Sequence, residues 1–396
     1  MPARIVHVDL DAFFVEVCRR HHPELRTIDL LIIGGRADGR GVVESASYGA
    51  RRFGVRAGMP SAQALRLCPG ATLFHGDFKH YREASREVRG VLERHAPVVV
   101  MASLDEAYLD FGGTERLYPV SLLPAAERIR DDVRAAAGLD CSIGIGPNRM
   151  VAKLASDYAK PRGLMEVRSG WEEGFLAGLP LAALPGVGPR TAERLAQLGL
   201  QEVRQVQQMP LGKLEALLGD DAKGLKLRAH GHGGSTLRPR STAKSVSRET
   251  TLSVDLRDPA RLETVLARLV AWVGADLRSD GLAARTVVLK LRHDDFRTVT
   301  RRRTLDDPTQ LDAELYAAAA ALFRDAFEDV RARDRGVRLI GVAAVNLTAA
   351  AEGDLFEPPE RTRLRKLTSA VDEVRARFGF DALAPARLQR PKPPKG

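Results

Sequence analysis

Residues 4–14 read Arg-Ile-Val-His-Val-Asp-Leu-Asp-Ala-Phe-Phe. Apolar residues alternate in the first part of this stretch, which predicts a short β-strand over residues 4–9. The strand ends on two acids, Asp9 and Asp11, and an aromatic pair follows them. Acids at the end of a strand are well placed for a site at the edge of a sheet, so Asp9 marks the first candidate position.

A second segment, residues 98–110, reads Val-Val-Val-Met-Ala-Ser-Leu-Asp-Glu-Ala-Tyr-Leu-Asp. Its two apolar runs predict a hairpin with Asp105 and Glu106 at the tip. If this hairpin lies beside the first strand, three carboxylates share one site, and they repel each other unless cations neutralise them. Oxygen ligands suit Mg²⁺, and two such ions clamp an in-line displacement at phosphorus. The alternative is that these acids simply face loops.

The rest of the first 165 residues also mixes strands and helices. Apolar residues recur with helical spacing in 84–92 and 122–136. A strand-like run at 141–146 precedes a predicted helix over 148–158, which ends before Lys160-Pro161 because proline disfavours helix. The pattern indicates an α+β fold.

Composition points to a polyanionic partner. The chain has 396 residues, 61 Lys plus Arg against 51 Asp plus Glu, and a formal charge of +10, a balance that favours nucleic acid. Its length suggests several domains. The three cysteines are far apart, which argues against a disulfide framework, and there is no signal-peptide or membrane-spanning run. We therefore expect a soluble cytoplasmic protein with no membrane partner.

The central region contains a glycine-rich hairpin, 184–191, that resembles a helix-hairpin-helix and would offer backbone N–H groups to a phosphate. Such glycines are also common in ordinary turns. The stretch 222–248 contains no acid but many bases, which predicts a linker that contacts phosphates. After it, the pattern predicts a βαββαβ domain whose two middle strands are rich in arginine. A further amphipathic helix is expected at 364–378.

The sequence motifs around the acids resemble those of the Y-family DNA polymerases, in particular the DNA polymerase IV branch. The motifs occur in the family's order and are Val8-Asp-Leu-Asp-Ala-Phe-Phe14, Ala46-Ser-Tyr-Gly-Ala-Arg-Arg-Phe-Gly-Val55, Ser103-Leu-Asp-Glu-Ala-Tyr-Leu-Asp110, Ser142-Ile-Gly-Ile-Gly146, Ala159-Lys-Pro-Arg-Gly163, Pro185-Gly-Val-Gly188 and Phe296-Arg-Thr-Val-Thr-Arg-Arg-Arg-Thr304.

The resemblance implies a right-hand, multidomain α+β architecture and template-directed, low-fidelity synthesis of DNA past damaged templates. The implied boundaries are 1–12 and 78–166 for the palm, 13–77 for the fingers, 167–233 for the helix-hairpin-helix thumb, 234–244 for a basic linker, 245–350 for the little finger and 351–396 for a tail. The alternative is a catalytically silent, polymerase-shaped adaptor that binds DNA in repair; such relatives lose the acids.

The resemblance also assigns the metal ligands. Asp9 and Asp105 would bind or bridge two Mg²⁺ ions, Glu106 would hold the ion nearest the primer 3′-OH, and the Leu10 carbonyl would complete the nucleotide-associated ion. Mn²⁺ is an alternative metal. Asp11 is as well explained by a structural role.

For the incoming deoxynucleotide, the resemblance implies triphosphate contacts from Tyr48, Arg51 and Lys160, with further nucleotide contacts from Phe13 and Ser45. A hydroxyl, a guanidinium fork and an ammonium are suitable donors to phosphate oxygens.

Phe14 aligns with the steric gate, a ring that fills the space of a ribose 2′-OH. Two residues depart from the family's fingers motif, Glu44 and Gly49, and Glu44 would add a negative charge near the nascent base pair.

The predicted macromolecular contacts lie further along the chain, and the protein is expected to be a monomer on primer-template DNA. A tail segment retains two apolar residues of a clamp-binding peptide but not its glutamine, so sliding-clamp binding and folding back on the little finger both stay open. The candidate DNA contacts are Gly186, Gly188, Lys244, Arg248, Arg297, Arg301 and Arg303, and the candidate clamp contacts are Leu355 and Phe356.

Overall fold

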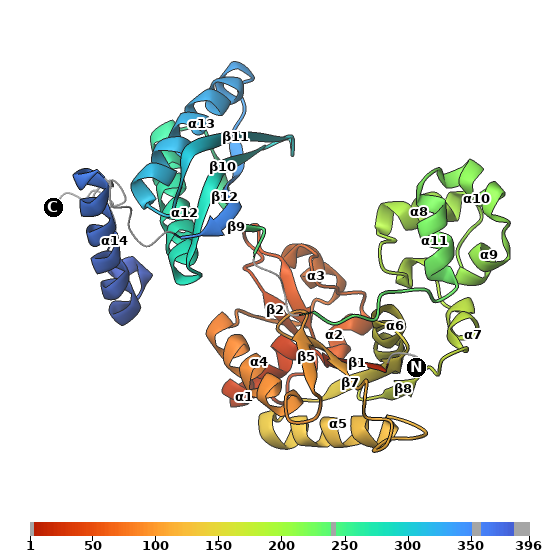
Figure 1. Cartoon of the computed structure of the whole chain (residues 1–396). Helices are drawn as coiled ribbons and strands as arrows, with labels where there is room; N and C mark the ends of the chain where they lie inside the picture. The colour runs from red at the N-terminus through yellow and green to blue at the C-terminus, as the bar shows by residue number, and fades with distance from the viewer. Residues whose placement is uncertain (1–3, 239–242, 351–357, 384–396) are drawn as a thin grey trace. The chain divides into compact units, whose positions relative to one another are not determined.

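The computed structural model describes residues 4–238, 243–350 and 358–383. Contacts divide the chain into two units, residues 1–240 and residues 241–396. Figure 1 shows the elements of both units along the chain.

The first unit is built on a five-stranded sheet in which β1 is the central strand. Its order is β5-β6-β1-β7-β8, and β1 runs antiparallel to both of its neighbours. The predicted hairpin is confirmed, and it does lie beside the first strand. The bounds are Ile5–Leu10 for β1, Val98–Met101 for β5, Glu106–Asp110 for β6, Cys141–Gly146 for β7 and Leu164–Glu166 for β8.

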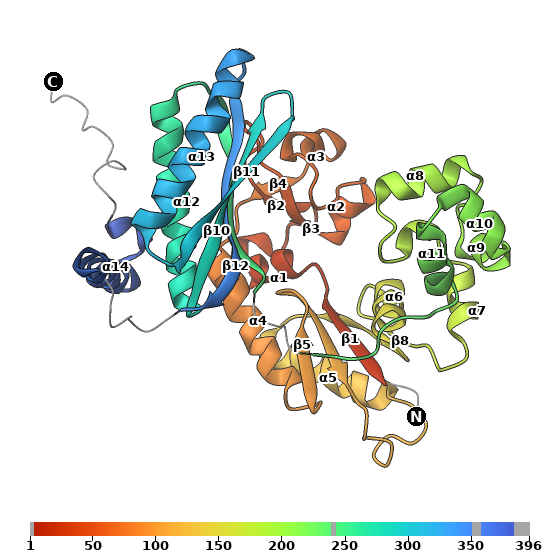
Figure 2. The same ribbon diagram turned by 45° about the horizontal axis from the view of Figure 1, so that its top comes forward.

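Helices cover both faces of this sheet. Val6 and Val8 belong to the core under α4 (Phe78–Leu92) and α5 (Leu123–Ala137). Ile5 lies on the other face, in a cluster with Ala152 of α6 (Arg149–Ala159). Figures 1 and 2 show α5 and α6 on opposite sides of the sheet. Because side chains alternate along a strand, His7 and Asp9 also point to the α6 face.

A glycine on β7 sets how closely α6 approaches the sheet. A Cβ atom at Gly144 would overlap backbone atoms of Ala152 and Ser156 on α6. The missing side chain therefore lets the helix backbone lie directly on the strand. This close approach brings the polar face of α6 within reach of the carboxylates on β1 and β6.

A smaller sheet with its own apolar core forms the region expected to be the fingers. Its strand order is β3-β2-β4. The elements of this region are α1 (Phe13–His21), a 3-10 helix (Pro23–Leu25), β2 (Leu31–Gly34), β3 (Val43–Ala46), α2 (Tyr48–Arg52), α3 (Ser61–Leu67) and β4 (Thr72–Phe74). Ser47 caps α2 by accepting a hydrogen bond from the Ala50 N–H.

Short helices form the region expected to be the thumb, and they share a core with α6. They are α7 (Glu172–Ala177), a 3-10 helix (Leu181–Ala183), α8 (Pro189–Gln197), α9 (Val203–Gln208), α10 (Leu211–Leu218) and α11 (Asp221–Ala229). The prediction of a linker beginning at 222 is wrong, because residues 221–229 form α11. Lys226 is not directed at phosphates; its ammonium donates to the carbonyls of Val206, Gln207 and Met209 at 2.6–3.0 Å.

The second unit contains the predicted βαββαβ domain, with sheet order β11-β10-β12-β9. Figure 2 shows its two long helices together on one face of the sheet, and both contribute to one apolar core. The elements are β9 (Ser245–Leu256), α12 (Pro259–Ser279), β10 (Leu282–His293), β11 (Thr298–Thr309), α13 (Asp312–Ala332) and β12 (Val337–Ala349). The other face of the sheet is open among the described residues of this unit.

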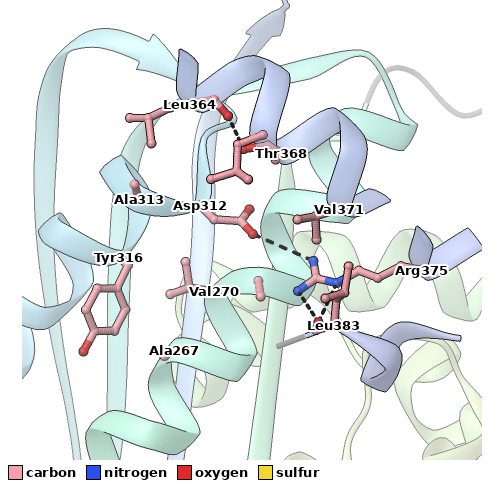
Figure 3. A pocket seen from close by; sticks show the side chains of 12 residues that line it. Ala267, Val270, Asp312, Ala313, Tyr316, Leu364, Thr368, Val371, Arg375 and Leu383 are labelled. Atoms are coloured by element: carbon pink, nitrogen blue, oxygen red, sulfur yellow. Dashed lines mark hydrogen bonds and ion pairs between the residues drawn. The ribbon is translucent and has the colours of Figure 1, made fainter. Parts of the chain in front are cut away.

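The predicted C-terminal helix is present as α14 (Pro359–Phe378), followed by a 3-10 helix (Phe380–Ala382). Ion pairs join it to the helical face of the domain: Asp372 meets Arg278, and Arg375 lies 3.9 Å from Asp312. Phe380 stacks on Trp272 with ring centroids 3.7 Å apart. An apolar cavity of about 440 Å³ remains between α12, α13 and α14, as Figure 3 shows.

Candidate active site and nucleic-acid interface

The backbone places the three predicted carboxylates next to one another. Asp9 lies opposite Glu106 in the β1–β6 register. The Leu10 N–H donates to the Asp105 carbonyl at 2.9 Å, which ties the end of β1 to the tip of the hairpin. The adjoining ends of two antiparallel strands thus carry all three acids, which are close in the fold although far apart in the sequence.

Two lysines neutralise this cluster. The Lys160 ammonium is 2.7 Å from Asp9 Oδ2, and the Lys153 ammonium is 2.6 Å from Glu106 Oε1. Asp105 instead accepts a hydrogen bond from the hydroxyl of Ser103 at 2.5 Å. Within the described part of the chain, no three His, Cys, Asp or Glu side chains stand together as a metal-binding group.

Burial and charge act differently on the two acids. Burial raises the pKa of Asp9 to about 6, although Lys160 opposes the rise. The His7 ring, 3.6 Å from Glu106, and the Lys153 ammonium lower the pKa of Glu106 to about 2. Glu106 is therefore fully ionised at neutral pH, and the site holds negative charge that requires cations.

The His7 ring lies next to Glu106, on the side of the sheet that faces α6. The ring is fully buried, and its Nδ1 is 2.7 Å from the Ser156 hydroxyl. That hydroxyl donates to the Lys153 carbonyl at 2.7 Å, so it accepts the hydrogen bond from His7 Nδ1–H. Nε2 of His7 then faces Glu106 at 3.6 Å and has no hydrogen-bond partner among the described residues. Sequence reasoning missed His7, Lys153 and Ser156 because a contact between a strand and a distant helix leaves no local signal.

The three acids each contact a separate partner and do not converge on one point, but their residue types fit a hard divalent cation. Three carboxylates and a strand-end carbonyl are the oxygen ligands that Mg²⁺ and Mn²⁺ take. The two lysines already show that this cluster binds cationic groups. A metal here would take over the oxygens that now contact ammonium groups.

Two of the three predicted triphosphate residues, Tyr48 and Arg51, form a second group with Asp11. The Tyr48 hydroxyl donates to Asp11 at 2.8 Å, and the Arg51 guanidinium lies 4.9 Å from the centroid of the Tyr48 ring. Asp11 also accepts from Ser142 and from the Arg162 N–H, so a structural role explains it fully. Lys160 reaches Asp9 and does not contact the Tyr48 and Arg51 pair. Ser45 is buried on β3.

The ring of Phe14 is held in one place. It stacks on Tyr81 with centroids 4.1 Å apart and meets Phe78 edge-on at 5.9 Å. Phe13, its neighbour, is buried in the core. These ring contacts fix the position of Phe14, as the predicted role of a steric gate requires.

One departure from the family motif, Glu44, lies near this stack. Burial is the main cause of the raised pKa of Tyr81 and of Cys18, and the charge of Glu44 adds to both shifts. Its Oε2 atom is buried without a hydrogen-bond partner among the described residues. Gly49 is closely packed, because a Cβ there would meet Asp29.

The register of the second sheet separates the basic residues into two faces. Arg301 pairs with Leu289 and Arg303 with Val287, both core residues, so these arginines point to the helix side. Arg301 contacts Asp329 of α13, and Arg248 contacts Asp276 of α12. The open face instead carries Lys290, Arg292 and Arg302, which the sequence-based selection omitted.

The other predicted DNA contacts are placed as follows. Gly186 has φ +88°, a conformation that favours glycine, and the Arg228 guanidinium lies close beside it. Gly188 is the N-terminal cap of α8. Lys244 and Arg297 are exposed. Leu355 and Phe356 lie outside the described residues.

Comparison with known proteins agrees with these features. Residues 8–157 match the impB/mucB/samB family, residues 243–355 match the C-terminal domain of that family, and residues 182–227 match the thumb domain described as DNA polymerase-iota. A DNA polymerase IV of Dehalococcoides mccartyi (strain CBDB1) is 38% identical over 98% of both chains. That of Caulobacter vibrioides is 38% identical over 97% of this chain and 93% of its own.

Solved structures give the same result. The Y-family DNA polymerase chimera Dbh-Dpo4(243-245)-Dbh matches with a TM-score of 0.76 at 26% identity, covering 87% of this chain and 98% of its own. The insertion ternary complex of Dbh DNA polymerase matches with a TM-score of 0.60 over the same shares.

Fold, site and relatives together define a DNA-directed DNA polymerase of translesion synthesis. The chain belongs to the Y family of DNA polymerases. Enzymes of this family are metal-dependent, and the adaptor alternative is not favoured. No helix within the described residues has the length and apolar character needed to cross a membrane.

Proposed function

We propose that Asp9, Asp105 and Glu106 are the catalytic carboxylates and that they hold two Mg²⁺ ions, with Mn²⁺ as a substitute. The observation that carries this proposal is the register of Asp9 with Glu106, together with the hydrogen bond from Leu10 to Asp105. When bound, a pair of divalent ions stabilises both the attacking and the leaving oxygen of an in-line displacement at phosphorus. The Leu10 carbonyl would complete one ion's ligand set.

The chain's own side chains then orient the incoming deoxynucleotide. Arg51 and Lys160 donate to the triphosphate oxygens, which fixes the α-phosphate for attack by the primer 3′-OH. The Tyr48 hydroxyl, whose single proton is donated to Asp11 in this structure, turns that proton to a phosphate oxygen when the nucleotide binds. Phe14 excludes a ribose, while Phe13 and Ser45 complete the walls of the nucleotide site. Base pairing with the template, rather than a side chain, selects the base.

Primer extension tests the metal assignment directly. We expect the wild-type chain to add a deoxynucleotide with Mg²⁺ or with Mn²⁺ and to add none after chelation of divalent ions, because the carboxylates alone cannot stabilise the developing charge on phosphate. Addition at an undiminished rate in the presence of excess chelator would contradict the assignment.

We infer that DNA lies along the open face of the second unit's sheet and along the hairpin of the first unit. Lys290, Arg292 and Arg302 on that face, with Lys244 and Arg297, supply cations for phosphates. The N–H groups around Gly186 and Gly188, with Arg228, offer a further phosphate site. These contacts carry no base information, so binding is independent of sequence.

Two neighbouring arginines on β11 form a matched pair for this inference. Arg302→Ala removes a cation from the open face, and we expect weaker binding to primer-template DNA and a salt-dependence slope reduced by about one. Arg301→Ala removes a cation that already pairs with Asp329, so we expect a smaller change. Titrations at several salt concentrations measure both. A larger loss for Arg301→Ala would assign the DNA to the helix side.

The finer aspects of the biological setting are also proposals. We propose a cytoplasmic enzyme, in keeping with its bacterial relatives, and we propose that it works as a monomer. Docking of Leu355 and Phe356 in a sliding clamp would lengthen its residence on DNA.

A further inference from the structure

One face of α6 presents alternating charges to the carboxylate cluster. Lys153, Asp157 and Lys160 are spaced by four and three residues, which places them on the same side of a helix. Lys160 is the residue that ends the helix, in an extended conformation. Gly144 allows this face to lie close to the sheet.

Each lysine on this face contacts one acid of the active site. Lys153 contacts Glu106 at 2.6 Å, with about 30% of the lysine side chain and 27% of the glutamate side chain exposed. Lys160 contacts Asp9 at 2.7 Å and has a second partner in Asp157 at 2.9 Å. Lys160 therefore has an alternative partner when Asp9 is engaged elsewhere. Among the described residues, the Lys153 ammonium contacts no carboxylate other than Glu106.

We propose that Lys153 is an internal counter-ion of Glu106, which holds the metal-free site together and is displaced from the carboxylate when a divalent ion binds. The inference rests on the proposed function, because it takes Glu106 to be a metal ligand. Lys153 is a positioning residue in this scheme and touches neither substrate nor metal.

The proposal has two opposite consequences for a variant without the ammonium. Lys153→Met keeps the length of the side chain but leaves the ionised Glu106 without its cation, so the metal-free protein loses stability. The same change removes a positive charge that competes with the metal for one oxygen. Metal binding therefore becomes tighter, by about tenfold for a unit charge a few ångströms from a divalent ion.

Binding of Mn²⁺ to the protein alone, measured by the electron paramagnetic resonance signal of free Mn²⁺, tests this without DNA, nucleotide or catalysis. We expect Lys153→Met to bind Mn²⁺ about tenfold more tightly than the wild type, and Lys153→Arg, which keeps the charge, to stay within about twofold. Lys223→Met, a change at an exposed thumb lysine, is the matched control. Thermal unfolding should show a lower midpoint for metal-free Lys153→Met and a larger gain on adding Mn²⁺.

Glu106→Ala separates this inference from the proposed function. If Glu106→Ala weakens Mn²⁺ binding while Lys153→Met leaves it unchanged or weaker, the counter-ion role is wrong and the metal site stands. If Glu106→Ala has no effect on Mn²⁺ binding, the proposed metal site itself is wrong. In the double variant, the effect of Lys153→Met should vanish, because the two residues act through one contact.

Discussion

Glu106→Gln is expected to lower the rate of single-nucleotide addition by about a thousandfold or more, because it removes one negative oxygen from the metal ligands while keeping the volume of the side chain. Glutamine also keeps an oxygen that can accept a hydrogen bond from Lys153, so the strand end stays folded. The measurement is rapid-quench addition of one deoxynucleotide to a primed template. Binding to DNA should change little, since Glu106 does not contact the DNA backbone in this scheme.

The matched control for this prediction is Glu93→Gln at the end of α4, where the carboxylate pairs with Arg89 on the protein surface and with no other cation among the described residues. Its rate should equal that of the wild type. A Glu106→Gln enzyme with more than about a tenth of the wild-type rate would show that Glu106 does not hold a catalytic metal.

Phe14→Ala is expected to raise the use of ribonucleotides relative to deoxynucleotides by at least about a hundredfold, the scale of discrimination that one excluded group gives in a pocket. The reason is the rigid stack of Phe14 on Tyr81. Removing the ring opens the space that a 2′-OH needs, and it leaves the proposed metal ligands Asp9, Asp105 and Glu106 unchanged. Single-turnover addition of each ribonucleotide and deoxynucleotide measures the ratio.

A second gate variant guards against a simple loss of structure. Phe14→Leu keeps most of the apolar volume and should give an intermediate ratio. Phe378→Ala removes an exposed ring at the end of α14 and should leave the ratio unchanged. Equal losses with both sugars in Phe14→Ala, and no gain for ribonucleotides, would assign the gate to another side chain.

Much of the fold could be predicted because its signals are local. Alternation ending on Asp9 identified β1, and the apolar runs around Asp105 identified the hairpin. Most of helix α11 was mistaken for part of a linker because its basic, glycine-containing sequence from residue 222 onward carries little helical pattern. The contacts of the Lys226 ammonium stabilise the helix from outside. Tertiary contacts of this kind cannot be read from composition.

The arginines that we propose to face DNA were harder to select from the sequence, for a related reason. Arg301, Arg302 and Arg303 are consecutive, and the face that each takes depends on the register of β11 against β10. A shift of one residue exchanges the two faces. The sequence shows a basic strand, but only the paired structure shows that Arg302 is on the open side.

The structure brings the predicted acids together, but sequence motifs alone did not indicate the residues around them. Asp9, Asp105 and Glu106 were selected from motifs, whereas Lys153, Ser156 and His7 meet only because α6 packs on the sheet at Gly144. The positions of Lys153, Ser156 and His7 in the site could therefore be identified only from the packing of α6 on the sheet.

Primer extension by the wild-type chain on four templates that differ in a single templating base is the most direct measurement. The site described above should add the complementary deoxynucleotide on each template, with Mg²⁺ present, and Glu106→Gln should bind the same DNA without extending it. No extension by the wild type, with salt-sensitive DNA binding retained, would contradict the catalytic assignment and support the adaptor alternative.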